Sequence, residues 1–179
     1  PVRGGIVLDL HLMNRIVEIN EDVGYAVIEP GVTIGQIDAE LKQRGYWVQV
    51  PAGPPGSAGL LPGYILHGYG HLGAKFGINS EQITGMEVVL PSGEIARLGA
   101  CAVSPYWFHR TPLPDLVGLF LGWQGATGIV TKLGVNIDPR PPFKAMVGWG
   151  LFSDHGDPLP EPCARFLIKM QRADVAHDI

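Results

Sequence analysis

The segment from residue 51 to residue 73 constrains this chain more than any other part of it. It is rich in glycine and proline, yet it carries Leu60, Leu61, Ile65 and Leu66. A long irregular segment inside a compact domain is usually either functional or disordered. Because these apolar side chains are stabilised by burial, we expect the segment to be ordered and packed, with something bulky lying against it.

Short apolar runs bounded by turn residues predict several strands on both sides of this segment. A buried strand is expected first, followed by two hairpins whose connections contain Gly24 and Gly93. The expected strands are Ile6–Leu10, Ile16–Ile19, Tyr25–Glu29, Met86–Leu90 and Glu94–Arg97. Residues 100–115 contain three prolines and no period, which predicts a loop.

One helix is expected after the first hairpin. Thr33 can accept a hydrogen bond from the backbone of Gln36, and the Gln36 side chain can reach back toward Thr33, which is a capping box. Gly45 then ends the helix. The apolar residues of this helix share one face and are Ile34, Ile37 and Leu41.

A late strand is expected at Ile129–Ile137, where apolar and other residues alternate. This pattern predicts one buried face, with Leu133 on it, and one open face, with Lys132 and Gly134 on it. The prolines at 139, 141 and 142 indicate a boundary between units. A strand within 144–152 and a helix near 161–172 cannot bury a core alone, so we expect residues 142–179 to begin a second domain.

Charge and cysteine content exclude several classes of protein. The net charge is -4 and the sequence pI is about 5.8, which argues against a nucleic-acid partner. The sequence has no apolar run of the roughly 20 residues that a membrane span needs. Cys101 and Cys163 are far apart and outside any C-x-x-C pair, so we expect reduced thiols, no metal site and a cytoplasmic protein.

Gly68–Gly73 spells G-x-G-x-x-G, the pattern of a dinucleotide-binding Rossmann turn. That turn follows a strand and opens a helix, whereas here Pro62-Gly63 precedes it and no helical run follows. His67 and His71 have a metal-ligand spacing, but a helix is not expected among these glycines and no third ligand is evident. Ordinary polar or packed histidines are the favoured interpretation, and neighbours of a flavin are the second.

Ser57 lies between Gly56 and Ala58 without the strand–turn–helix setting of a hydrolase nucleophile. Successive N–H groups in a glycine-rich turn can bind an anion, so a phosphate contact is the favoured functional interpretation. An ordinary loop is the alternative. The turn 125–128 leading into the late strand has no chemistry of its own when taken alone.

Taken in order, five segments resemble the FAD-binding domain shared by vanillyl-alcohol oxidase, para-cresol methylhydroxylase and the D-lactate dehydrogenases. The resemblance covers about residues 3–141. Its segments are Glu29–Thr33, Pro51–Ser57, Gly68-Tyr69-Gly70, Gly85–Glu94 and Gly128–Lys132. The residues of the third and fourth segments are slightly more similar to the phenol-oxidising branch of the family.

The resemblance implies an α+β fold of two subdomains, with the first largely missing, in an FAD-binding domain over 1–141. It implies that 142–179 begins a ferredoxin-like cap domain that binds substrate. It also implies phosphate contacts at Gly56 and Ser57, backbone approach at Gly68 and Gly70, and an adenine side at Ile129 and Val130. The full set of implied FAD-binding residues is Pro51, Ala52, Gly56, Ser57, Gly59, Gly68, Gly70, Gly128, Ile129 and Val130.

The activity implied by the resemblance is hydride transfer from an alcohol, a phenol or a 2-hydroxy acid to N5 of the flavin. The implied partners are this small-molecule substrate, an electron acceptor that is oxygen or a carrier protein, and a second copy or a partner subunit. No catalytic acid or base is assigned. A truncated, non-catalytic flavin-fold module acting through a partner chain is the alternative, and the flavin reductase of cell-wall precursor synthesis is a less favoured third interpretation.

Overall fold

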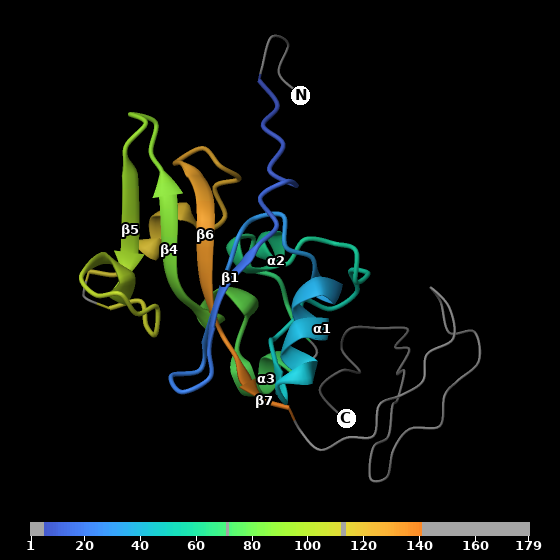
Figure 1. Cartoon of the computed structure of the whole chain (residues 1–179). Coiled ribbons are helices and arrows are strands. Elements are labelled where there is room, and N and C mark those ends of the chain that lie inside the picture. The colour runs from blue at the N-terminus through green and yellow to red at the C-terminus, as the bar shows by residue number, and fades with distance from the viewer. Residues whose placement is uncertain (1–5, 71, 112–113, 141–179) are drawn as a thin grey trace, which may run out of the picture. The chain divides into compact units, whose positions relative to one another are not determined.

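The computed structural model describes residues 6–70, 72–111 and 114–140. Their main feature is a five-stranded antiparallel sheet in the order β1-β2-β6-β4-β5, with α1 and α2 beside it (Figure 1). Its strands are β1 (Ile16–Asn20), β2 (Tyr25–Ile28), β4 (Ile83–Val89), β5 (Ile95–Gly99) and β6 (Ile129–Asn136). A small second sheet pairs β3 (Tyr46–Trp47) with β7 (Asp138–Pro139).

The two predicted hairpins are confirmed as β1–β2 and β4–β5. The late strand, β6, is also confirmed, and it pairs with β2 on one side and with β4 on the other. Two local hairpins are therefore joined into one sheet by a strand that is distant from the first hairpin in sequence. The described residues thus combine helices with an antiparallel sheet, as the expected α+β fold requires.

The predicted helix is α1 (Ile34–Gln43), and its apolar face is buried as expected. Thr33 Oγ1 accepts a hydrogen bond from the Gln36 amide at 3.2 Å, which confirms the cap. The prediction that the Gln36 side chain bonds back to Thr33 is wrong, because this side chain instead donates to the carbonyl of Asn14 at 2.8 Å. The helix thereby ties itself to the chain that enters β1.

The main core lies between α1, α2 and one face of the sheet. The opposite face is also covered in part, because Trp107 packs with Tyr25, Val27 and Cys101. The expectation of an open face at Gly134 is therefore wrong. A Cβ at Gly85 or at Gly134 would lie 3.2 or 3.1 Å from the Trp107 ring, so this glycine pair provides room for the indole.

The expected strand at Ile6–Leu10 is also wrong. This segment has no regular structure, and Ile6 and Val7 are 97% and 91% exposed. No described strand lies beside it to supply hydrogen bonds, and an apolar run alone does not make a strand.

Residues 51–73, expected to be irregular, contain a short helix, and a second follows where no helical run was expected. These helices are α2 (Leu61–Ile65) and α3 (Gly73–Phe76). Single 3₁₀ turns make up the remaining helical structure of the described residues. They are η1 (Asn79–Gln82), η2 (Ala100–Ala102), within the predicted loop, and η3 (Val117–Phe120).

The expected second domain at 142–179 lies outside the described residues, as do His71 and Cys163. Among the residues that are described, no helix has the length and apolar character needed to cross a membrane.

Candidate functional site

The glycine- and proline-rich segment runs along the first turn of α1. The amide of Ile34 donates to the carbonyl of Ala58 at 2.9 Å, and the amide of Gly35 donates to the carbonyl of Gly56 at 2.7 Å. The Gln36 amide is already bound by the Thr33 cap. The N-terminal donors of this helix are therefore occupied, so α1 does not offer them to an anion.

The same segment presents a different set of backbone donors. Residues 52–57 are exposed, and the amides of Gly53, Gly56 and Ser57 donate to no backbone acceptor among the described residues. A Cβ at Gly56 would have its nearest contact at 3.7 Å, so this glycine is not required by packing inside the protein. Free amides on an accessible glycine-rich turn fit the phosphate contact predicted for Gly56 and Ser57.

Gly68 and Gly70 have a packing role of their own. A Cβ at Gly68 would lie 2.6 Å from the carbonyl oxygen of Gly63, and one at Gly70 would lie 2.9 Å from that of Val50. The backbone here is pressed against protein, and the amide of Ala52 donates to the carbonyl of Tyr69 at 2.6 Å. The structure thus brings Pro51, Ala52, Gly68 and Gly70 together, and their contact with a cofactor stays a prediction.

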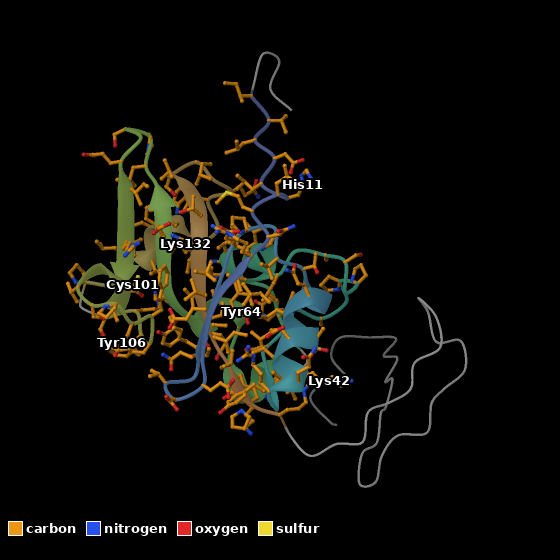
Figure 2. The ribbon with its side chains drawn as sticks, viewed as in Figure 1. His11, Lys42, Tyr64, Cys101, Tyr106 and Lys132 are labelled. Atoms are coloured by element: carbon orange, nitrogen blue, oxygen red, sulfur yellow. The ribbon has the colours of Figure 1, made fainter. Side chains whose placement is uncertain are left out.

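Buried polar side chains lie beneath this loop. Tyr64, labelled in Figure 2, donates its hydroxyl to the carbonyl of Gln49 at 2.6 Å, and burial raises the pKa of Tyr64. Asn79 also donates to the Gln49 carbonyl and accepts nothing at Oδ1 from the described residues. These bonds join Gln49, before the glycine-rich segment, to Tyr64 within it and to Asn79 after it, which holds the segment in place.

His67 and Ile65 connect the glycine-rich segment to two later parts of the chain, η1 and the segment before β6. The Nδ1 of His67 lies 2.9 Å from Oγ of the buried Ser80, and its φ of 56° places a non-glycine residue in the left-handed region. The neighbouring Ile65 carbonyl accepts a 2.7 Å hydrogen bond from the amide of Gly122. The segment that leads to Gly128 is therefore attached to the glycine-rich segment.

The last group of predicted FAD-binding residues, 128–130, lies at the start of β6. A Cβ at Gly128 would lie 2.9 Å from the carbonyl oxygen of Val89, so the turn is tight against β4. Ile129 is half-buried, whereas the Val130 side chain packs in the main core. An adenine contact at Ile129 and Val130 stays a prediction.

Two buried carboxylates near these turns were missed by the sequence analysis. Glu29 immediately precedes the turn 30–33, and Arg15 binds it with Nη2 at 2.7 Å and Nε at 3.1 Å. The hydrogen bond from Arg15 holds the pKa of Glu29 below its usual value. Because Arg15 lies outside the expected strands, no sequence pattern marked this pair.

Glu87 is the second buried carboxylate, on β4. Lys132 Nζ lies 2.7 Å from its Oε1 and Arg97 Nε lies 3.0 Å from its Oε2, while the Thr131 hydroxyl donates to Oε1 at 3.1 Å. Burial by itself would raise the pKa of Glu87, but the hydrogen bonds from Lys132 and Arg97 outweigh it and the pKa is lowered. The contacts of Glu87 follow from the cross-strand register. This register is set only when the strands pair, so the sequence alone carried no signal for the site.

Two other sets of residues do not form a site. The Cys101 thiol is free and buried, and burial raises its pKa, so it is a packing residue with low reactivity. Within 6–70, 72–111 and 114–140, no three His, Cys, Asp or Glu residues are grouped to hold a metal ion.

Exposed apolar side chains lie on both segments that meet at Ile65 and Gly122. Tyr69 is 73% exposed and Trp123 is 60% exposed. Leu66, Leu72 and Leu119 are exposed in the same two segments. Exposed apolar side chains on two joined segments can contact a flat, partly apolar ligand or a second protein surface.

The chain is similar to known flavoproteins. A family model described as an FAD binding domain matches residues 1–99. The chain is 35% identical over 161 residues to the flavoprotein subunit of 4-cresol dehydrogenase (hydroxylating) from Pseudomonas putida, covering 87% of this chain and 30% of that one. It is 34% identical over 152 residues to a glycolate oxidase subunit of Bacillus subtilis, covering 80% of this chain and 30% of the relative.

A solved structure of p-cresol methylhydroxylase with substrate bound superposes with a TM-score of 0.65 and 34% sequence identity, over 76% of this chain and 27% of that chain. The chain thus spans about a third of the length of these relatives. The match to the family model, the relatives and the fold agree with the predicted family and with FAD as its cofactor. The chain belongs to the FAD-binding domain family of FAD-linked oxidases.

Proposed function

We propose that this chain binds FAD for an FAD-linked oxidase or dehydrogenase. The observation that carries the proposal is the accessible turn 52–57, next to the packed loop 68–70. The amides of Gly53, Gly56 and Ser57 in this turn find no backbone acceptor within the described part of the chain. In this proposal Gly56 and Ser57 bind phosphate, with Gly59 continuing the same turn. Pro51, Ala52, Gly68 and Gly70 lie along the cofactor, and Gly128, Ile129 and Val130 contact its adenine side.

The chemistry that FAD would supply is hydride transfer from the substrate carbon to N5 of the flavin, with oxygen or a carrier protein as the electron acceptor. The residues of this chain would bind and orient the cofactor, because none of them is assigned as a catalytic acid or base. An alcohol, a phenol or a 2-hydroxy acid is the proposed substrate class. The likeness to a 4-cresol dehydrogenase subunit favours the phenol, and the likeness to a glycolate oxidase subunit favours the 2-hydroxy acid.

A further domain is proposed to supply the substrate site, beginning within 142–179. The exposed apolar side chains at Tyr69 and Trp123 support a covering surface, whether from this polypeptide, a second copy or a partner subunit. The relative from Pseudomonas putida is itself named as a flavoprotein subunit. We also propose a cytoplasmic location, supported by the free Cys101 thiol, which cell fractionation would test.

The same exposed apolar surface supports a second candidate, a non-catalytic flavin-fold module that acts through a partner chain. The two candidates differ in cofactor binding. A visible spectrum of the purified chain, before and after acid precipitation, separates them. Flavin bands at about 370 and 450 nm support the first candidate, and colour in the pellet indicates a covalent link. A chain that stays colourless with added FAD refutes the first candidate and supports the second.

The Gly56→Val variant locates the site. A Cβ at Gly56 has no contact with protein below 3.7 Å, so we expect the variant to fold. Its side chain would nevertheless stand on the turn where phosphate is proposed to bind, and FAD affinity should fall by at least about tenfold. Gly118→Val is the matched control, because Gly118 lies in η3, has no positive φ and has no neighbour within 4 Å of a Cβ. Equal FAD affinity in both variants would place the phosphates elsewhere.

A further inference from the structure

Five charged side chains of alternating sign cross the sheet in one row. The register pairs Glu87 with Arg97 of β5 on one side and with Lys132 of β6 on the other. Ile28 pairs with Leu133, which places Glu29 opposite Lys132, and the amide of Glu29 donates to the carbonyl of Arg15. We call this the cross-strand charge row, and in spatial order it is Arg15, Glu29, Lys132, Glu87 and Arg97.

The carboxylates of the row are buried and its outer cations are not. The side chains of Glu29 and Glu87 are 4% and 7% exposed, and that of Lys132 is 26% exposed. Lys132 is the central cation, and Figure 2 labels it on the sheet. Its charge acts on both carboxylates, through a 2.7 Å contact with Glu87 and at longer range on Glu29. Without Lys132, Glu87 would keep only Arg97 as a cationic partner and Glu29 only Arg15, and the side chains of both arginines are more than half exposed. The buried carboxylates would then be less well compensated, which is destabilising.

Both ends of the proposed FAD site are attached to this row. Glu29 leads directly into the turn 30–33, and that turn holds the glycine-rich segment through the bond from the amide of Leu60 to the carbonyl of Val32 at 3.0 Å. On the other side Glu87 binds Lys132 and the Thr131 hydroxyl, which directly follow residues 128–130. The two turns are distant in sequence, and the row links them across the sheet.

We propose that Glu29, Lys132 and Glu87 are positioning residues that hold the turn 30–33 and the segment 125–131, which contains the turn before β6 and the start of this strand, in a fixed relation for FAD binding. This inference rests on the proposed function for the location of the cofactor. None of the three residues needs to touch FAD. They act by keeping the backbone that is proposed to bind it in register.

The test compares Lys132→Met with Arg44→Met in the full chain. Lys132→Met removes the central charge and keeps a similar apolar stem. Arg44 is a control for the loss of a cation that binds two carboxylates away from the proposed site. Its partners Glu40 and Glu21 have side chains that are 40% and 41% exposed, and it lies at the C-terminal end of α1. Lys132→Arg is the conservative variant and should restore much of what Lys132→Met loses.

We expect Lys132→Met to raise the Kd for FAD by about tenfold, measured by flavin fluorescence under conditions in which the chain is folded. Arg44→Met should leave the Kd unchanged. Amide hydrogen exchange without FAD should also become faster in Lys132→Met, both at 125–131 and across the sheet at 30–33. Arg44→Met should leave exchange in both turns unchanged.

Two outcomes would overturn the inference. One is that Lys132→Met leaves the Kd for FAD unchanged and lowers the free energy of unfolding only as much as Arg44→Met does. The other is faster exchange confined to 125–131. If the unmodified chain binds no FAD, the proposed function fails, and the exchange comparison still decides whether the row couples the two turns.

Discussion

Trp107 lies in the loop 100–111, and we expect its buried side chain to stabilise the fold. The Trp107→Ala variant tests this expectation. The indole is only 7% exposed, and it lies over the glycine pair 85 and 134 against Tyr25 and Val27. The variant leaves a void on this face, because the glycines have no side chains that could fill it. We therefore expect a large loss of stability and an opening of the loop 100–111.

The magnitude follows from the buried area. An indole buries about 200 Å² of apolar surface, which at about 25 cal/mol per Å² amounts to about 5 kcal/mol as an upper value. Measured losses for a buried aromatic side chain replaced by Ala are about 3–5 kcal/mol. That is a large part of the total of about 5–15 kcal/mol that is usual for a domain.

Trp123→Ala is the matched control, since Trp123 is 60% exposed and should lose about 2 kcal/mol at most. Urea unfolding followed by far-UV circular dichroism measures both variants, and a lower midpoint at constant slope reports stability. A loss of less than about 1 kcal/mol for Trp107→Ala would refute the reasoning. An equal loss in the two variants would do the same.

Three further outcomes are expected from the described contacts. Thr33→Ala should lower the free energy of unfolding by about 1 kcal/mol, measured in urea, because the helix cap is lost. Gly68→Ala should cost about 1–3 kcal/mol with or without FAD, because its Cβ meets the Gly63 carbonyl oxygen at 2.6 Å; equal stability would contradict this packing. The pKa values of Glu29 and Glu87 are lowered in the folded chain, so their stabilisation should be present at neutral pH and be lost as pH falls below about 4.5. Urea midpoints measured across this range should fall less in Glu87→Gln than in the unmodified chain.

Local features were predictable because neighbouring residues determine them. The turns at Gly24 and Gly93 mark both hairpins, and Thr33 marks the start of α1. The order of the glycine-rich segments was enough to identify the family and its cofactor. Ile6–Leu10 shows the limit of this reasoning, because apolar character predicted a strand but a strand also needs a neighbour.

The tertiary structure decided which residues meet across the sheet. Only the insertion of β6 between β2 and β4 sets Lys132 opposite Glu29 and Glu87, and a shift of one residue would have turned every side chain to the other face. It also decided that a Cβ at Gly68 would collide with the backbone of Gly63, whereas one at Gly56 would make only an ordinary contact at 3.7 Å. The sequence by itself determined the hairpins, the helix and the family, because these depend on short patterns and their order. Contacts between distant segments depend on strand register and packing, which no short pattern specifies.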